Sequence, residues 1–313
     1  HDSEIYFTSG GSESNNIVLK GILNPGDHFI TSSYEHPSIS KLLEYLENKN
    51  VEITIVKPNA NGLIEINSIL DAIKENTKLV SIMYVNNELG TINPISEMAE
   101  VLSKKNILLH SDAVQYVGKG LLNMSSSNID MLSIGAHKFY GPKGIGILYV
   151  KKGIKINPLI DGGGQESGMR AGTENISAIV GMDFALQKAC DNINAYIEKI
   201  KTLESYFISS LDKNNIYYRI NGKNTVNGII NITFFGVDGH ALLINLDMLN
   251  IAISYGSACS SGSVSAPGPL LEIGMNEEEA KNTVRISIGK MIKKDDIDYL
   301  IDAIVKIIRR IRK

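Results

Sequence analysis

Short apolar and β-branched runs alternate with stretches of helical hydrophobic spacing through the first half of the chain. The runs that predict strands are Ile5–Thr8, Phe29–Ser32, Val51–Val56, Leu79–Tyr84, Ile107–His110, Met131–Ile134 and Gly146–Val150. The stretches that predict helices between them are Ser14–Leu23, Pro37–Lys49, Ser68–Glu75 and Ile95–Lys105. This alternation is typical of βαβ units, so it predicts an α/β domain with a mostly parallel sheet covered on both faces.

The pattern changes near Asn175. One long helical stretch is predicted over Ile176–Leu211. Shorter strands and helices are expected after it, at Ile229–Phe235, Ala241–Leu249, Ile251–Tyr255, Val284–Ile288 and Lys294–Arg312. This mixture predicts a smaller α+β domain. With the boundary inside or just after the long helix, the large domain covers residues 1–190 and the small domain covers residues 191–313.

The composition narrows the function classes. The chain has 313 residues, with 31 Lys and Arg against 34 Asp and Glu, and a formal net charge of -3. At about 150 residues per domain, this length fits two domains. The charge balance provides no basic excess for binding nucleic acid or an anionic membrane surface. No apolar run approaches the roughly 18 residues that a membrane span needs.

Cysteine usage bears on location and chemistry. Cys190 and Cys259 cannot form a disulfide framework, so the sequence predicts a protein of the reducing cytoplasm. Cys190 falls within the long predicted helix and is expected to be a packing residue. Cys259 lies among glycines, serines and one alanine over Gly256–Ser263, which predicts a flexible surface loop. A thiol in such a loop is usable as a nucleophile, the alternative being an incidental thiol.

The turn after the first predicted strand is rich in glycine. It reads Ser9-Gly10-Gly11-Ser12-Glu13-Ser14 and leads into a predicted helix. Because the N–H groups at a helix N-terminus bind anions, Gly11 and Ser12 are candidates for binding a phosphate. The alternative is a plain turn with Ser12 as the helix cap. The turn lacks the Lys-Ser/Thr of a nucleotide P-loop and the spacing of a Rossmann fingerprint.

Four more predicted strands are followed by polar residues: His36, Asn87, Asp112 and Lys138. Taken singly, His36 reads as a helix cap or surface residue, Asp112 as an N-cap and Lys138 as a solvated loop lysine. Open α/β sheets, however, bind ligands at the carboxyl ends of their strands. A phosphate cradle, a flat ring, an acid and a lysine at those ends are what pyridoxal phosphate requires.

Several segments resemble the cysteine desulfurases, a branch of the class V aminotransferase group within the fold-type I pyridoxal-phosphate enzymes. The segments that carry the resemblance are Phe7–Asn16, Val85–Gly90, His110–Lys119, His137–Gly146, Gly162–Thr173, Gly256–Val264 and Val284–Gly289. They span nearly the whole chain in order, and the cysteine loop is similar to that of the longer-loop group. The resemblance implies an α/β fold-type I transferase whose smaller C-terminal domain carries the catalytic cysteine loop.

The resemblance also implies roles for the residues at matching positions. The catalytic residues are expected to be Cys259, Lys138 and His36. The cofactor-binding residues are expected to be Gly11, Ser12, His36, Asn87, Asp112, Gln115, His137, Lys138 and Thr173. Thr173 would reach the phosphate of the neighbouring subunit in a homodimer. The substrate-binding residues are expected to be Arg285 and Asn87, and no metal site is expected.

The chemistry that the resemblance implies is sulfur transfer. Lys138 would bind pyridoxal phosphate covalently and move the α-proton of L-cysteine. Asp112 would pair with the ring nitrogen, His36 would stack on the ring, and Arg285 would hold the substrate carboxylate. The Cys259 thiolate would then take the substrate sulfur as a persulfide and leave L-alanine. A sulfur-acceptor protein would carry this sulfur to iron–sulfur cluster assembly or to tRNA thiolation.

The chain departs from the family pattern at several points. Gly135 stands where the family usually has serine, and Ser167 where it has arginine. Family members carry several dozen further residues before the point that matches Ile5, so we expect the true N-terminus to lie upstream. One alternative function is a related pyridoxal-phosphate lyase of the selenocysteine lyase type. Another is a truncated, non-catalytic scaffold that dimerises. The small residues around Cys259 favour the desulfurase.

Overall fold

The computed structural model describes residues 1–256 and 268–311, and contacts along the chain divide it into two compact units. The first unit comprises His1–Pro58, Ile64–Val85 and Asn93–Ile193. The second comprises Asn59–Leu63, Asn86–Ile92 and Asn194–Lys313. A single boundary near residue 190 leaves both short segments with the large domain, whereas their contacts join them to the second unit.

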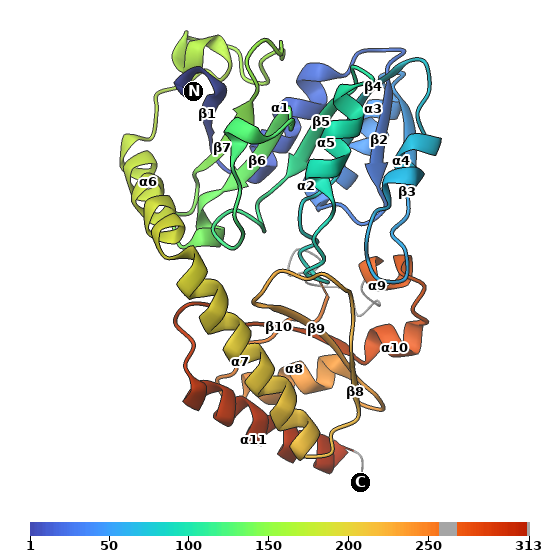
Figure 1. Cartoon of the computed structure of the whole chain (residues 1–313), viewed down its shortest axis with the longest axis vertical. Coiled ribbons are helices and arrows are strands. Elements are labelled where there is room, and N and C mark those ends of the chain that lie inside the picture. The colour runs from blue at the N-terminus through green and yellow to red at the C-terminus, as the bar shows by residue number, and fades with distance from the viewer. Residues whose placement is uncertain (257–267, 312–313) are drawn as a thin grey trace. The chain divides into compact units, whose positions relative to one another are not determined.

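The first unit is built on a seven-stranded sheet (Figure 1). Its strands are β1 (Ile5–Thr8), β2 (His28–Ser32), β3 (Glu52–Val56), β4 (Thr77–Ser81), β5 (Leu108–Asp112), β6 (Met131–Gly135) and β7 (Gly146–Val150). The strand order is β1-β7-β6-β5-β4-β2-β3, and the pairs from β6 to β3 are all parallel. The two antiparallel pairs both involve β7, which pairs with β1 and β6, so the predicted α/β fold with a mostly parallel sheet is confirmed.

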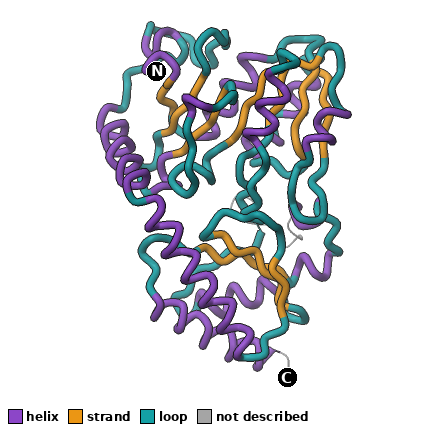
Figure 2. Tube along the Cα trace, viewed as in Figure 1, coloured by secondary structure: helices purple, strands orange, loops and turns teal. Residues whose placement is uncertain are grey.

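Helices and short 3-10 turns precede, connect and follow these strands (Figure 2). They are η1 (Asp2–Glu4), α1 (Gly11–Ile22), α2 (Pro37–Ser40), α3 (Leu43–Glu47), α4 (Ile66–Asp71), α5 (Ile95–Ser103), η2 (Met124–Ser126), η3 (Ala136–Phe139), η4 (Gln165–Gly168) and α6 (Ile176–Asp191). The α1 helix packs on β6 and β7, and its Ile17 and Leu19 are buried in a core with Phe29 and Leu148. This packing fixes the start of α1 beside the carboxyl ends of the central strands.

Two predicted helices are each divided in two. The prediction of one helix over Pro37–Lys49 was wrong, because the chain tightens between α2 and α3, where the Leu42 N–H bonds the Ile39 carbonyl three residues back. The prediction of one helix over Ile176–Leu211 was also wrong. Asn192 leaves the helical region at φ -113° and ψ 12°, which ends α6 before the next helix begins.

The second unit contains a three-stranded antiparallel sheet in the order β10-β9-β8. Its elements are α7 (Ile193–Lys213), β8 (Tyr218–Ile220), β9 (Ile229–Phe234), α8 (Gly239–Asp247), α9 (Gly268–Glu272), α10 (Glu277–Lys281), β10 (Thr283–Ser287) and α11 (Lys294–Ile311). Phe207, Phe234 and Ile304 are fully buried in one core formed by α7, β9 and α11. Within the predicted element Ile251–Tyr255, only Ser254 pairs with a strand residue, as an isolated bridge.

None of the helices in the described ranges combines the length and the apolarity that crossing a bilayer demands.

Candidate active site

Asp112 is the last residue of β5 and lies at the carboxyl end of the sheet of the first unit. Its side chain is buried and accepts two hydrogen bonds, from Asn15 Nδ2 at 2.8 Å and from the Val114 backbone N–H at 3.0 Å. Burial raises the pKa of Asp112, while these bonds and the charges of His36 and Lys138 lower it. The structure therefore places Asp112, His36 and Lys138 within electrostatic reach of one another.

His36 follows β2 and begins α2. Its Nδ1 accepts a hydrogen bond from the Ser38 backbone N–H at 3.1 Å and lies 2.7 Å from Ser38 Oγ. His36 is thus a helix cap, which was the alternative prediction, and it also lies beside Asp112. Burial lowers the pKa of His36, the charge of Lys138 lowers it further, and Asp112 opposes the change. A low pKa favours a neutral imidazole, the form that stacks on an aromatic ring without adding a charge.

Lys138 lies in the short turn η3 that follows β6. Ala136 and Phe139 on either side of it are buried and fix the turn. Lys138 itself is half-buried, and His137 is exposed. Tyr140 ends the turn in the left-handed region at φ 70°, which turns the chain sharply away from the strand. The lysine therefore emerges from a rigid point at the end of the sheet.

The glycine-rich turn after β1 leads directly into α1. Gly10 is the N-cap of α1, and no side chain caps this helix, so the alternative interpretation of Ser12 as the helix cap was wrong. A Cβ atom at Gly11 would lie only 2.5 Å from Val114 Cγ2, so a larger residue there would force the Val114 side chain to move. The first turn of α1 consequently offers backbone N–H groups beside the exposed Ser12 hydroxyl.

Asn15 was not predicted to be a site residue, although its side chain bonds both Asp112 and Ser38. Its Nδ2 donates to Asp112 Oδ2 and to Ser38 Oγ, at 2.8 Å each. Its Oδ1 is buried and has no hydrogen-bond partner among the described residues. An unsatisfied buried acceptor next to a buried carboxylate is costly unless a ligand supplies a donor or a cation. This feature and the glycine cradle fit a cofactor with a protonated ring and a phosphate.

Glu35 is another residue whose position the sequence did not indicate. Its carboxyl group is fully buried, where Oε1 accepts hydrogen bonds from Ser32 Oγ and from the Met83 N–H, the latter at 3.0 Å. Burial, together with the charge of Asp112, raises the pKa of Glu35 to about 8 although the hydrogen bonds from Ser32 and Met83 lower it. Glu35 is therefore mostly protonated at neutral pH and adds little negative charge beside Asp112.

Gln115, Thr173 and Cys190 are three further residues of the first unit for which the sequence made a prediction. Gln115 Oε1 accepts a hydrogen bond from Lys119 Nζ at 2.7 Å. Thr173 is exposed and lines a cavity of about 150 Å³ together with Ser9 and Arg170. Cys190 is exposed on α6, so the prediction of a packing residue was wrong.

The two predicted substrate-binding residues both belong to the second unit. Arg285 on β10 donates from Nη1 to the Asn87 carbonyl at 2.7 Å and from Nη2 to Ser254 Oγ at 2.9 Å. The neighbouring Glu88 is buried, which raises its pKa to about 7 although the charge of Arg285 lowers it. The guanidinium is thus held on two sides. Cys259 lies outside the described residues.

Gly135 differs from the family pattern, and the structure has room for the missing side chain. Its backbone is extended, at φ -125° and ψ 120°, and a Cβ atom added there would lie 3.4 Å from its nearest neighbours, on His137 and Val114. Gly135→Ser is therefore expected to fold normally and to bind pyridoxal phosphate about fivefold more tightly, since one added hydrogen bond contributes about 1 kcal/mol. Titration of the apoprotein measures the change. Gly135→Ala is the matched control and is expected to show no gain; an equal gain in both variants would contradict the role of the hydroxyl.

Comparison with known proteins assigns the family. The aminotransferase class-V family model matches residues 1–300. A cysteine desulfurase IscS of Clostridium botulinum is 41% identical over 319 residues, covering 99% of this chain and 80% of the relative. The IscS of Buchnera aphidicola is 42% identical over 316 residues, covering 99% of this chain and 78% of the relative.

Solved structures agree with these sequence relatives. A NifS-like protein superposes with a TM-score of 0.90 at 32% identity, covering 98% of this chain and 83% of that one. The structure described as SspA in complex with cysteine has a TM-score of 0.79 at 36% identity, covering 92% and 82%. The fold and the sequence relatives define a class-V aminotransferase, a fold-type I enzyme that depends on pyridoxal phosphate. Within that family the chain belongs to the cysteine desulfurases, which confirms the predicted family and cofactor.

Proposed function

We propose that this enzyme converts L-cysteine to L-alanine and holds the released sulfur as a persulfide on Cys259. The observation that carries the proposal is the grouping of Lys138, Asp112 and His36 at one edge of the sheet of the first unit. The similarity to the SspA structure, which was solved with cysteine, supports the choice of substrate.

Each residue of the first unit has a distinct part. Lys138 attaches the cofactor and moves a proton at the substrate Cα. Asp112 stabilises a positive charge on the ring nitrogen, and His36 covers the ring face. Gly11 and Ser12 bind the phosphate, with His137 nearby, and Gln115 bonds the ring's 3-oxygen. When bound, pyridoxal phosphate supplies an electron sink that lowers the cost of removing the substrate α-proton.

Arg285 is proposed to bind the substrate carboxylate. The fork of N–H groups on Arg285 matches a carboxylate better than a single ammonium does. Arg285 Nη1 bonds the Asn87 carbonyl, so a substrate bound at Arg285 also fixes the position of Asn87. The side chain of Asn87 is proposed to bind the substrate and the 3-oxygen of the cofactor ring.

The sulfur-transfer step balances without an external oxidant. The Cβ–S bond of L-cysteine breaks, and an S–S bond forms between that sulfur and Cys259. A proton takes the place of the sulfur on Cβ, so the products are L-alanine and the Cys259 persulfide. We propose that an acceptor protein removes this sulfur in the cytoplasm for iron–sulfur cluster assembly, or through a tRNA-thiolation enzyme. Incubation of the persulfide form with each type of acceptor distinguishes the two.

Replacement of Cys259 tests the function directly. With L-cysteine, the wild type is expected to gain one sulfur on Cys259 and none on Cys190, as read by mass spectrometry of tryptic peptides. Cys259→Ser should still bind the cofactor and turn yellow, because the thiol is not part of the cofactor site. It should release no alanine beyond a trace, while the matched control Cys190→Ser behaves as wild type. Alanine release by Cys259→Ser would favour a lyase, and a protein that never binds the cofactor would favour a non-catalytic scaffold.

We also propose that the enzyme is a homodimer. Three large apolar side chains form one stripe on α6 at helical spacing, and Ile176, Val180 and Phe184 are each 62–63% exposed. A stripe of this size is costly in water and fits a second copy of the chain related by a two-fold axis. Thr173, just before α6, would then lie near the partner's phosphate.

The dimer is tested by placing a charge on the α6 stripe. Phe184→Lys is expected to shift the protein from dimer to monomer in sedimentation equilibrium, because burying an unpaired ammonium is unfavourable. Met291→Lys, at an exposed apolar position of the second unit, is the matched control and should leave the dimer intact. A wild type that sediments as a monomer, or a Phe184→Lys protein that remains dimeric, would argue against this interface.

A further inference from the structure

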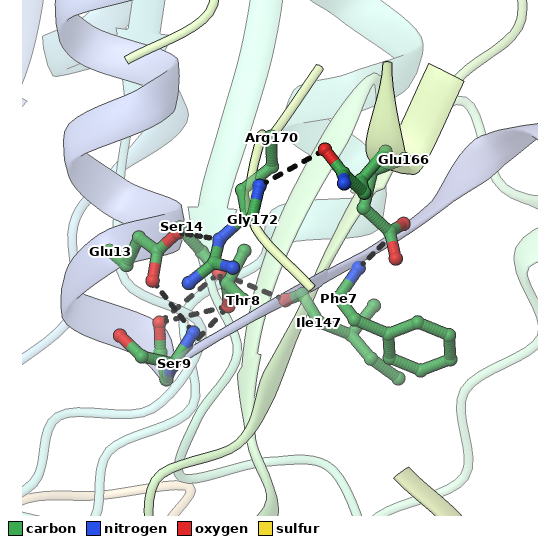
Figure 3. A network of polar contacts seen from close by, with 11 residues as sticks. Phe7, Thr8, Ser9, Glu13, Ser14, Ile147, Glu166, Arg170 and Gly172 are labelled. Carbon is green, nitrogen blue, oxygen red and sulfur yellow. Dashed lines mark hydrogen bonds and ion pairs between the residues drawn. The ribbon is translucent and has the colours of Figure 1, made fainter. Parts of the chain in front are cut away.

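A carboxylate lies in the first turn of α1, directly after the predicted phosphate-binding Ser12. Glu13 is only 10% exposed. Its Oε2 accepts a hydrogen bond from the Ser9 backbone N–H at 2.7 Å, and its Oε1 accepts one from Arg170 Nε at 2.9 Å. Figure 3 shows Arg170 extending from its loop toward Glu13, with Ser9 on the other side of the carboxylate.

Glu13 is ionised despite its burial. Burial alone would raise the pKa of Glu13, but the hydrogen bonds from Arg170 and Ser9 and the charge of Arg170 outweigh it and lower the pKa. The hydrogen bond to Glu13 in turn raises the pKa of Arg170. The pair is therefore a fully charged, partly buried ion pair, in which Arg170 is 24% exposed.

The position of Glu13 makes it a competitor for the phosphate site. An acidic residue at the third helical position commonly folds back to accept the backbone N–H of the N-cap residue, which is Gly10 in α1. The free N–H groups of the first helical turn are the groups that a phosphate needs, and a carboxylate so close to them repels the phosphate's negative charge. In this structure the Glu13 carboxylate instead bonds the N–H of Ser9, before the helix, and is neutralised by Arg170.

The loop that carries Arg170 is held in place by its own contacts. Glu166 Oε2 accepts the Phe7 backbone N–H on β1 at 3.1 Å, and Gln165 Oε1 accepts the Gly172 N–H at 3.2 Å (Figure 3). Glu166 and Ser167 are both left-handed, at φ 49° and 56°, a conformation that non-glycine residues adopt only when the surroundings impose it. The loop conformation is thus maintained by contacts that orient Arg170 toward α1.

We infer that Arg170 is a positioning residue for the cofactor phosphate, acting by neutralising Glu13 and holding its carboxylate away from the N–H groups of Gly11 and Ser12. This inference rests on the proposed phosphate site at the start of α1. It predicts that the unpaired Glu13 carboxylate, rather than the loss of the arginine as such, is what weakens phosphate binding. The effects of replacing Glu13 and Arg170 on the binding free energy of pyridoxal phosphate should therefore be strongly non-additive.

The test compares two ligands that differ only in the phosphate. Apoprotein is titrated with pyridoxal phosphate and with pyridoxal, and binding is followed by visible absorbance. Arg170→Gln is expected to bind pyridoxal phosphate about tenfold more weakly, which corresponds to one charge effect at a partly buried helix terminus. Its affinity for pyridoxal should stay within about twofold of the wild-type affinity. A tenfold change, by comparison, corresponds to about 1.4 kcal/mol. The double variant Glu13→Gln/Arg170→Gln should recover most of the loss.

Two further variants keep the test decisive. Glu13→Gln alone should bind pyridoxal phosphate at least as tightly as wild type, and it does not depend on Arg170→Gln folding. Arg219→Gln breaks the exposed Arg219–Glu279 ion pair of the second unit and should change neither affinity. The urea unfolding free energy of each apoprotein separates stability from binding.

Some outcomes would overturn the inference and others the proposed phosphate site. If Arg170→Gln weakens both ligands equally, or the double variant binds as weakly as Arg170→Gln, then Arg170 is only a structural anchor of its loop. Weaker binding by Glu13→Gln would likewise reject the inference. If instead the wild type binds pyridoxal phosphate no more tightly than pyridoxal, and Ser12→Ala changes nothing, the phosphate site itself is misassigned.

Discussion

Lys138→Ala is expected to give a folded protein that binds pyridoxal phosphate reversibly and releases alanine about 10²–10⁴-fold more slowly, the range found when a positioned proton-transfer group is lost. The turn around Lys138 should persist, because buried Ala136 and Phe139 and the Gly141 N–H bond to the Ala136 carbonyl maintain it. Borohydride reduction followed by peptide mass spectrometry measures covalent attachment directly.

The matched control for this variant is Lys143→Ala. Lys143 is an exposed lysine of the same loop, five residues further along the chain. It should retain covalent cofactor on Lys138 and turn over normally. Cofactor fixed by borohydride in Lys138→Ala, or lost in Lys143→Ala, would transfer the role to another lysine.

Asp112→Asn is expected to slow alanine formation by two to three orders of magnitude or more, because breaking a buried charge pair costs about 3–5 kcal/mol. The asparagine keeps one acceptor oxygen, which can bond either Asn15 Nδ2 or the Val114 N–H. Its amide NH₂ then faces the other donor. The variant loses both the ring's charge partner and one hydrogen bond, while the cofactor should still bind through the phosphate and Lys138.

A half-buried aspartate just before β6 provides the control. Asp130 precedes β6, its pKa is raised by burial, and its Oδ2 accepts the Leu109 N–H at 2.9 Å. Asp130→Asn keeps an acceptor oxygen for the Leu109 N–H and should not slow a fully loaded enzyme. A loss of about 3–5 kcal/mol should slow turnover far more than tenfold, since about 1.4 kcal/mol corresponds to a factor of ten. Turnover of Asp112→Asn within about twofold of wild type would therefore remove Asp112 from the cofactor site.

The strand-end argument explains why the proximity of three candidate site residues could be predicted. Parallel strands bring their carboxyl ends to one edge, so residues that follow β2, β5 and β6 meet there whatever their separation along the chain. His36, Asp112 and Lys138 obey this rule. Asn87 follows β4 in the same way, but its segment is bonded to the second unit by Arg285 and Asn231. Periodicity carries no information about such long-range bonds.

Other features leave no local signal in the sequence. The Glu13–Arg170 pair joins residues 157 positions apart, and each looks like an ordinary surface charge. Glu35 stands among the polar residues that follow β2, a sequence context typical of an exposed turn, yet its side chain is buried. The strand β8 spans only Tyr218–Ile220, with Arg219 in its centre, so it is too short to show an alternating pattern.

The two short segments that join the second unit have a consequence for how the chain folds. Backbone bonds connect Gly90 and Ile92 with Val226 and Asn224, at 2.8 and 2.9 Å, and Asn61 with Lys223 at 3.0 Å. During synthesis the backbone groups of these two segments remain unpaired until their hydrogen-bond partners, more than a hundred residues further along the chain, have left the ribosome. Such non-local pairing gives a high contact order and slow closure. A fragment that begins after residue 193 would expose these unpaired backbone groups, so the second unit is not separable by a single cut.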